Sequence, residues 1–349
     1  MKKTFQKSLI AVAALAAMSA SFAADKGTSN ILFPYVSTGA NAVTLITLAS
    51  GGLASAPTYR YAMKTIGAAN SVGCDHQDGT SSLTANDVVQ FEVSNKFAAN
   101  TAFANGDTSV GYNYTGGAGK HGFLIINTGV AAAMNAIYGE ALVIDAASGL
   151  RLSYSSQGLN TTDTTAGNPD FTLNNGGAIT GGPASAPVYI PSGSSNAHGA
   201  NIVTWLNTAA VTTSWFVLPL GTMLEMTPSG AIGGLTAAFS MTDTGGATGQ
   251  FGAYNMTETF TSGGLVTSAR CIGAITRSDT LMPGAISNTA AGGMAVLNTY
   301  NGGTTTALQD GGVAGGTTGA VFHKALVYKL QSAGTGANAL GFISREADK

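Results

Sequence analysis

Charged side chains are scarce in this sequence of 349 residues. Lys, Arg, Asp and Glu together make up 9% of it, against roughly 25% in an ordinary soluble protein. Apart from Lys2, Lys3 and Lys7 at the start, 12 basic and 17 acidic residues remain, without any cluster of Lys or Arg. Such a chain does not attract a phosphate backbone, so we expect no nucleic-acid partner.

Residues that commonly carry catalysis are also few. The chain has four His residues, and no GxSxG segment marks a nucleophilic serine. Residues 117–122 (GAGKHG) have the spacing GxGxxG, but the run that follows is typical of a strand, whereas nucleotide binding needs a helix there. We therefore expect neither an enzyme nor a nucleotide-binding protein, and no organic cofactor.

A single apolar run stands out, at residues 9–18, and no second one of comparable length follows it. It lies between the three early lysines and the small residues Ser21 and Ala23, which is the pattern of a cleavable secretory signal peptide. Ten residues are too few to cross a bilayer, which takes roughly 20, so a retained anchor is the weaker alternative. The sequence predicts a signal peptide at residues 1–23, cleavage between Ala23 and Ala24, and no transmembrane helix.

Cysteine is nearly absent, with only Cys74 and Cys271 in the chain. In an oxidising, exported compartment a lone pair usually forms a disulfide, and we predict one here. It would close a loop of about 200 residues, for which the chain-entropy model gives roughly 5 kcal/mol of stabilisation. Two buried free thiols are the alternative.

What the sequence does contain is glycine, at 48 residues, together with many Ala, Ser, Thr and Asn. Glycine turns between short strands explain this composition better than disorder does, because the net charge is low and the hydrophobic content is not. In residues 58–64, Tyr59, Tyr61 and Met63 alternate with Arg60 and Lys64, as in a strand with one buried face.

Similar alternation at residues 88–93 predicts that Glu92 points outward, opposite Val89, Phe91 and Val93. Other runs are apolar at successive positions, which suits strands covered on both faces. These runs lie at residues 43–48, 122–126, 141–144, 215–220 and 293–297. The sequence thus predicts an all-β protein of antiparallel β-sandwich type, with one large or two packed β domains and long loops rich in Gly, Thr and Asn.

One segment differs in composition from the rest. Residues 157–199 have few large apolar side chains and many Thr, Asn, Gly and Pro, so we interpret them as a long polar loop or linker. The predicted organisation is an N-terminal β region at residues 24–156, this loop, and a C-terminal β region at residues 200–349. Both one domain and two separate domains are compatible with this pattern.

Two groups of residues are candidates for binding. Asp75 and Asp78 lie in residues 74–79 (CDHQDG), where a calcium ion is one hypothesis and a simple turn formed by Asp and Gly is the favoured one. Trp205 and Trp215 could form a surface on which sugars stack, although aromatic residues in strands more often belong to the core.

From these features we expect an exported, non-enzymatic structural or adhesive protein of the cell surface. Its partners would be further copies of itself or other envelope components, as in a surface-layer or filament subunit. A carbohydrate- or ligand-binding β module is the first alternative, and an outer-membrane β-barrel is the second. The signal predicts export, and we expect the destination to be the cell surface or the extracellular medium, with the periplasm and the outer membrane as alternatives.

Overall fold

The computed structural model describes the chain in separate segments, and the structural statements below concern these residues. They are residues 30–51, 56–70, 72–94, 111–128, 137–146, 150–159, 200–206, 211–219, 234–240, 252–256, 258, 260–262, 266–270, 272–276, 292–301, 321–322, 325–333, 340–345 and 347–348. The signal peptide and the polar segment at 157–199 fall almost wholly outside this set, so both stay predictions.

Every element in the described residues is a β-strand, and the described strand pairs are antiparallel. The prediction of an all-β protein with antiparallel sheets is thereby confirmed. The described part of the chain contains no helix with the length and apolar character that crossing a membrane requires. Two compact units can be distinguished, and each is described by itself.

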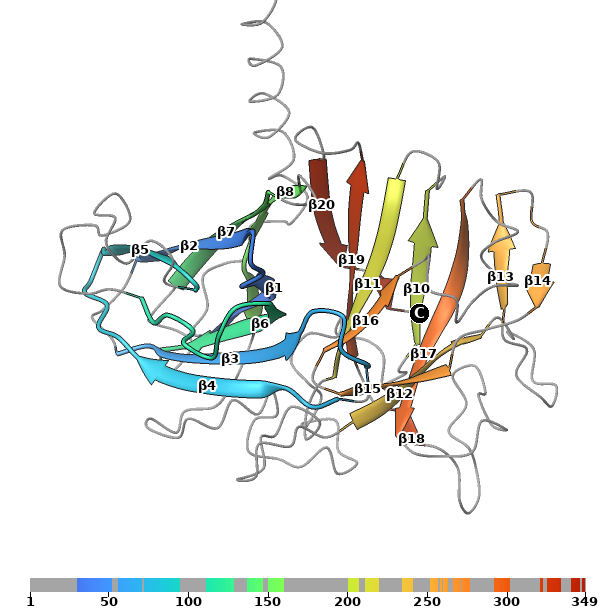
Figure 1. The fold of residues 1–349 in the computed structure, drawn as a ribbon, viewed down its shortest axis with the longest axis horizontal. Helices are drawn as coiled ribbons and strands as arrows, with labels where there is room; N and C mark the ends of the chain where they lie inside the picture. The colour runs from blue at the N-terminus through green and yellow to red at the C-terminus, as the bar shows by residue number, and fades with distance from the viewer. Residues whose placement is uncertain are drawn as a thin grey trace, which may run out of the picture. The chain divides into compact units, whose positions relative to one another are not determined.

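The first unit comprises residues 1–61, 77–169 and 335–344. Its strands belong to two sheets with the orders β4-β3-β6-β1-β9 and β5-β2-β7-β8, which appear as two layers in Figure 1. Residues 62–65 of β3 and 75–76 of β4 belong to the second unit. The strands of the first sheet are β1 (Asn30–Ser37), β3 (Thr58–Thr65), β4 (Asp75–Thr80), β6 (Lys120–Asn127) and β9 (Gln157–Leu159). Those of the second are β2 (Ala42–Ser50), β5 (Val88–Glu92), β7 (Ile137–Asp145) and β8 (Leu150–Ser155).

The second sheet has one well-buried face. Along β2, fully buried residues alternate with half-buried ones, and the period of two continues in β7 and β8. Ile46 on β2, Val143 on β7 and Leu152 on β8 are each at most 1% exposed. Residues 43–48 were predicted to be covered on both faces; the half-buried Leu45 and Val43 show that the outer face is covered less completely.

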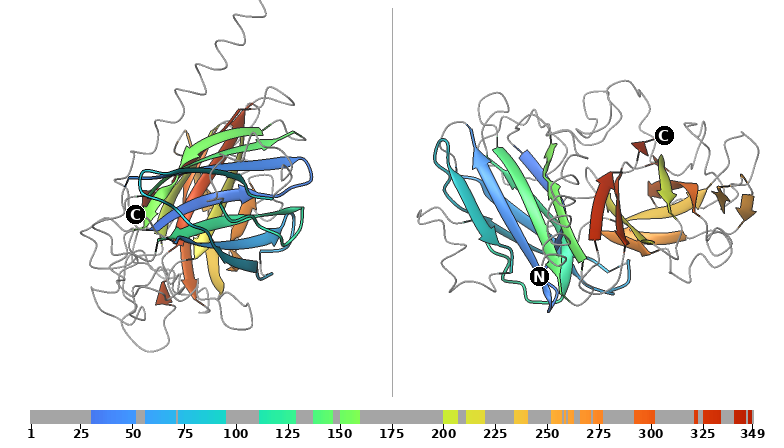
Figure 2. Two further views of the ribbon diagram at one scale, coloured as in Figure 1. Left: turned by 90° about the vertical axis from the view of Figure 1, so that its left-hand side faces the viewer. Right: turned by 90° about the horizontal axis from the view of Figure 1, so that it is seen from above.

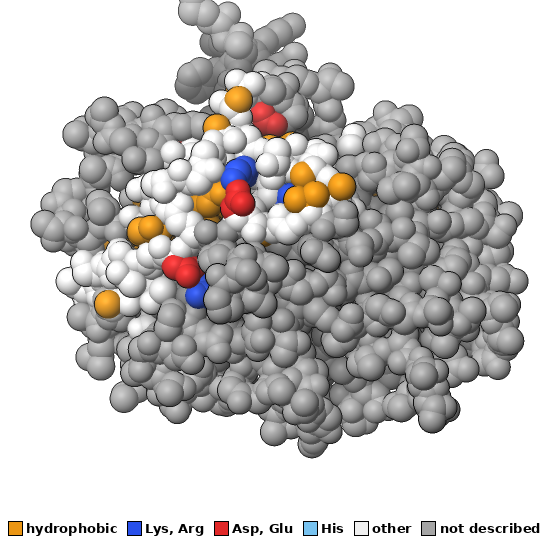
Figure 3. Space-filling view, turned by 60° about the horizontal axis from the view of Figure 1, so that its bottom comes forward, with side chains coloured by type: hydrophobic (Ala, Val, Ile, Leu, Met, Phe, Trp, Pro, Cys, Tyr) orange, Lys and Arg blue, Asp and Glu red, His pale blue; other side chains and the backbone are white. Residues whose placement is uncertain are grey.

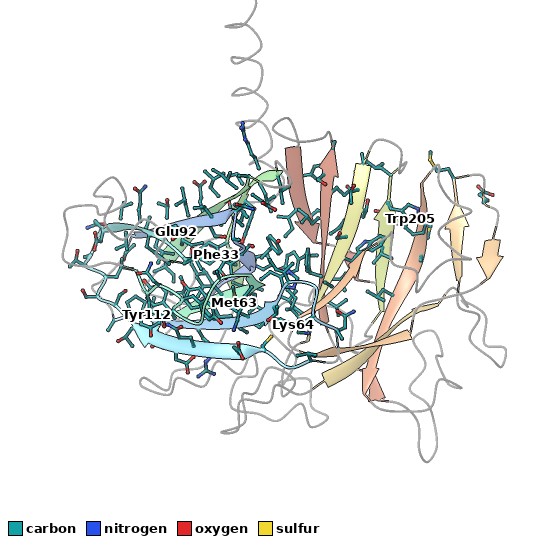
Figure 4. The ribbon with its side chains drawn as sticks, viewed as in Figure 1. Phe33, Met63, Lys64, Glu92, Tyr112 and Trp205 are labelled. Carbon is teal, nitrogen blue, oxygen red and sulfur yellow. The ribbon has the colours of Figure 1, made fainter. Side chains whose placement is uncertain are left out.

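Side chains of the two sheets contact one another across the first unit. The rings of Phe33 on β1 and Tyr154 on β8 meet edge to face, with centroids 6.4 Å apart. Those of Tyr59 on β3 and Phe91 on β5 do the same at 5.8 Å. Figure 4 shows Phe33 between the two layers. Such edge-to-face pairs add specific geometry to the burial of apolar area.

A glycine makes room for one of these rings. A Cβ atom on Gly139 of β7 would lie 2.4 Å from Cζ of Phe33 and 3.1 Å from Cδ1 of Ile31. We expect Gly139→Ala to lower the free energy of unfolding by about 1–3 kcal/mol, because the ring must shift in a packed core. Gly51→Ala is the control, since the nearest atom to its added Cβ is 3.9 Å away, and equal stability losses at the two positions would contradict this packing. Denaturant titration measures both.

The second unit comprises residues 62–76, 170–334 and 345–349. Its larger sheet has the path β14-β13-β17-β10-β21, with β12 paired to β15 and β17, and β18 paired to β17. These strands are β10 (Ala200–Trp205), β12 (Gly234–Ser240), β13 (Gly252–Asn255), β14 (Phe260–Ser262), β15 (Val266–Arg270), β17 (Gly293–Asn301), β18 (Val321–Phe322) and β21 (Ala347–Asp348). Figure 2 shows them from two further sides.

A smaller sheet of this unit has β11 (Val211–Pro219) between β16 (Gly273–Thr276) and β19 (Ala325–Ala333). The remaining strand among the described residues is β20 (Leu340–Arg345). Trp215, Phe216, Val217 and Leu218 of β11 are successive residues, and all are at most 5% exposed. The apolar run predicted at 215–220 is therefore covered on both faces, as expected, over these four residues.

Candidate functional site

Polar side chains gather where β1 meets the turn into β2. Ser37 and His121 are directly opposite each other on β1 and β6, and their exposed fractions are 3% and 9%. The ring of Tyr35 meets that of His121 edge to face at 6.3 Å. Burial raises the pKa of Tyr35 to about 12, while a hydrogen bond with the Ser37 side chain lowers it and the charge of Asp145 raises it.

Ser, His and Asp are also the residue types of a hydrolytic triad, but the contacts described here serve the turn. The Oγ of Ser37 accepts the backbone N–H of Gly39 at 3.3 Å. The backbone N–H of Ser37 donates to Oγ1 of Thr44, whose hydroxyl donates back to the Ser37 carbonyl, both at 3.0 Å. These bonds satisfy backbone groups that would otherwise be buried and unpaired. No sequence pattern indicates this cluster, because Ser37 and His121 come from strands far apart in the chain.

A second cluster is built from tyrosines on β3 and on residues 112–114. Tyr59 and Tyr112 have ring centroids 6.3 Å apart, and Tyr61 and Tyr114 have theirs at 5.6 Å. The hydroxyl of Tyr61 donates to the Tyr112 carbonyl at 2.6 Å. A Cβ on Gly79 of β4 would lie 2.0 Å from the Tyr112 ring. The cluster thus fixes residues 112–114 against the first sheet.

Burial makes these phenols hard to ionise. The pKa of Tyr59 is raised to about 12 by burial, partly opposed by the hydrogen bond from Ser81, and burial raises that of Tyr61 well above 10. The unfolded value is about 10, so the folded protein holds protons that the unfolded chain loses. The contribution of these tyrosines to the free energy of unfolding is therefore complete below about pH 10 and is lost as the pH rises towards about 12.

We accordingly expect tyrosinate absorbance to appear together with unfolding in an alkaline titration. Tyr59→Phe removes one buried phenol, so its unfolding free energy should change less steeply over the same pH range. The variant also loses the 2.9 Å bond from Ser81, which should cost about 1 kcal/mol at neutral pH. Ionisation of all tyrosines near pH 10 in the folded state would contradict the burial of this cluster.

The predicted calcium residues lie on a strand, where a turn was the favoured expectation. Residues 75–80 form β4, so the interpretation of residues 74–79 as a turn is wrong beyond Cys74. The strand pairs with β3, and this is where Arg60 meets Asp78: its Nε and one terminal nitrogen donate to the two carboxylate oxygens at 2.7 and 3.1 Å.

Asp75 and Asp78 do not converge on a common point. They are three residues apart on a strand, where side chains alternate between faces, and Asp78 is engaged by Arg60. No group of three His, Cys, Asp or Glu side chains suited to a metal ion occurs within the described ranges. The arrangement is that of a cross-strand ion pair, and the calcium hypothesis gains no support from it.

Both tryptophans are in the core of the second unit. Trp205 is 3% exposed and Trp215 is 0% exposed. Their rings meet edge to face, with centroids 5.9 Å apart and planes at 88°. A stacking surface for sugars needs an open ring face, and neither residue offers one in this structure.

Lys64 of β3 was expected to face outward, yet it is only 2% exposed. Its Nζ donates to the carbonyls of Asn70 at 3.1 Å and Ile272 at 2.8 Å. The Asn70 side chain in turn donates to the Ala274 carbonyl and accepts its N–H, each at 2.9 Å. Residues 64–70 are thus fastened to residues 272–274, which lie in the same unit.

The two cysteines flank these contacts. Cys74 is 6% exposed and lies a few residues beyond Asn70, while Cys271 immediately precedes Ile272 but falls outside the described residues. No cysteine within the described ranges is free. The hydrogen bonds of Lys64 and Asn70 thus hold residues 64–70, which precede Cys74, close to residues 272–274, which follow Cys271.

The strand register places four apolar side chains side by side on the outer face of the β5-β2-β7-β8 sheet. Leu45 lies opposite Leu142, and Val43 lies opposite Ile144, on the neighbouring strands β2 and β7. All four side chains are half-buried. We call these four residues the aliphatic face. Within the first unit, no described strand covers the outer side of this layer (Figures 1 and 2).

The aliphatic face has one charged neighbour of each sign. Glu140 precedes Leu142 by two residues on β7, and Arg151 on β8 lies opposite Ile144. Both are exposed, and neither forms an ion pair within the described part of the chain. On the face that Figure 3 shows, the described part is mostly uncharged polar groups and backbone, with a few charged side chains and small groups of hydrophobic ones.

Comparison of the chain with protein-family models, with curated proteins and with solved structures found no significant match.

Proposed function

We propose that this chain is an exported, non-enzymatic structural or adhesive protein of the cell surface, which assembles with copies of itself as a surface-layer or filament subunit. The aliphatic face is the observation that carries the proposal. An apolar area on a folded surface marks an interaction site more often than a random surface does. The low charge of the chain adds little repulsion between copies, and the signal-peptide pattern supports export.

The buried polar clusters are consistent with this role. Ser37 and His121 serve a turn, the tyrosines hold residues 112–114, and Asp78 pairs with Arg60. A catalytic site needs functional groups that converge on space open to a substrate, and these groups are used within the fold instead. We therefore propose a structural function for the chain and no chemical step.

The test is to delete the gene and examine intact cells by electron microscopy, alongside fractionation of cells that carry it. We expect a surface layer or filament to disappear and to return when the full chain is supplied again. The protein should be found at the cell surface, with Ala24 at its N-terminus. An unchanged envelope, or a protein that begins at Met1, would count against the proposal.

We further propose that the first unit is a β-sandwich. The ring contacts of Phe33 with Tyr154 and of Tyr59 with Phe91 join its two sheets. The hydroxyl of Tyr154 also donates to the carbonyl of Tyr35, again from one sheet to the other. Contacts between inner-face side chains of two sheets are what face-to-face packing in a β-sandwich requires, and they support this proposal.

We also propose that Cys74 and Cys271 form a disulfide in the second unit. The bonds of Lys64 and Asn70 to residues 272–274 support it, because they hold segments close in sequence to the two cysteines near each other. Export supports it as well, since disulfides persist in oxidising compartments. Mass spectrometry of unreduced peptides should find the two cysteines linked, whereas two free thiols would exclude the bridge.

A further inference from the structure

We propose that two copies of this chain associate face to face through the aliphatic face, about a two-fold axis that crosses the strands at the Leu45–Leu142 pair. This inference rests on the proposed self-assembly and names the surface that it uses. Two-fold interfaces are the commonest in homo-oligomers, and in them each patch meets its own copy.

The strand register fixes which side chains would then meet. A two-fold axis perpendicular to the strands places each strand over the same strand of the second copy. It also reverses the direction in which the residues run along that strand. Leu142 therefore meets Leu142 of the second copy, and Glu140 lies over Ile144 of the second copy. In each copy, Arg151 is the direct cross-strand neighbour of Ile144. Glu140 therefore lies one strand away from Arg151 of the second copy, across the separation of about 10 Å between packed sheets.

Charge complementarity selects a second copy as the occupant. Glu140 lies two residues to one side of the centre of the aliphatic face, and Arg151 lies two residues to the other side. The two-fold axis therefore brings Glu140 of each copy near Arg151 of the other. Both Glu and Arg have side chains long enough to meet across packed sheets when the strands cross at the small angles usual for such packing. The half-buried leucines and Ile144 provide the apolar centre, and the charges form its rim.

Sedimentation velocity of the mature chain over a range of concentrations tests the interface. We expect reversible association, weakened about tenfold or more by Glu140→Arg and likewise by Arg151→Glu, since each places like charges together across the interface. The double variant, Glu140→Arg with Arg151→Glu, should restore association, because the pair is merely reversed. A structural defect would not be repaired in this way.

Leu142→Asp should abolish association, because the new carboxylate would face its own copy on the axis. Its unfolding free energy is measured in parallel to show that the monomer is folded. The matched control for the charge change of Glu140→Arg is Thr80→Arg with Ser82→Arg, which adds the same charge at exposed positions outside this sheet. That control should associate like the original chain.

The outcomes separate this inference from the proposed function. Association that survives all the single variants, or is not restored by the double one, overturns the interface and leaves self-assembly through another surface standing. A chain that stays monomeric at every concentration overturns the interface too. If the interface behaves as expected but gene deletion leaves the envelope unchanged, the surface-structure proposal falls and the interface remains.

Discussion

Loss of the Cys74–Cys271 bridge is expected to lower the free energy of unfolding by about 2–5 kcal/mol. The bridge would close a loop of about 200 residues, for which restriction of the unfolded chain alone accounts for about 5 kcal/mol. Cys74→Ser and Cys271→Ser should have equal effects, and the double variant should be no worse than either one. Denaturant unfolding in the presence and absence of reductant measures all four proteins.

The double variant is also the control for reductant. Reductant should shift the unfolding midpoint of the original chain and leave that of the double variant where it is. The hydrogen bonds of Lys64 and Asn70 to residues 272–274 should hold the two segments together in the reduced protein, so reduction is expected to destabilise the second unit without rearranging it. An original chain that is indifferent to reductant would contradict the disulfide.

Trp215→Ala is expected to cost about 3–5 kcal/mol of unfolding free energy, because it removes the largest fully buried side chain of the second unit and leaves a cavity. The edge-to-face contact with Trp205 is lost at the same time. Since the chain has only two tryptophans, emission from Trp205 alone reports unfolding of the variant directly.

Thr212→Ala provides the control on the same strand. Thr212 is an exposed residue of β11, so its truncation should change stability by less than about 0.5 kcal/mol. Trp215→Phe should fall between the two, because a ring still fills part of the site. A loss of under about 1 kcal/mol for Trp215→Ala would show that the ring is not packed as described.

The sequence was sufficient to predict the buried face of β3 but not the fate of its polar residues. Tyr59, Tyr61 and Met63 are buried together, as their spacing predicts. Lys64 was expected outside and is buried, because two backbone carbonyls accept hydrogen bonds from its ammonium group. Glu92 was likewise expected to face outward, yet it is 3% exposed and accepts the N–H and hydroxyl of Ser94. Periodicity locates strands, whereas partners decide whether a polar group can be buried.

Sites that depend on pairing between distant strands were beyond sequence reasoning altogether. Ser37 and His121 face each other only because β1 pairs with β6 in one particular register, and a shift of one residue would move every side chain to the other face. The aliphatic face likewise depends on strand pairing. Leu45 and Leu142 are apolar residues in the sequence, but only the pairing of β2 with β7 makes them neighbours. The tryptophans were correctly favoured as core residues, since aromatic side chains in strands usually are.

The stage of synthesis at which each unit can be completed follows from the chain segments that it contains. The first unit includes residues 335–344, and the second includes residues 62–76 as well as the final strand β21, which pairs with β10. Neither unit therefore has all its residues until nearly the whole chain has been synthesised, and contacts of such long sequence separation form slowly. Under the export that we propose for this chain, such a delay would allow translocation of the unfolded chain, with the sheets closing only on the far side of the membrane.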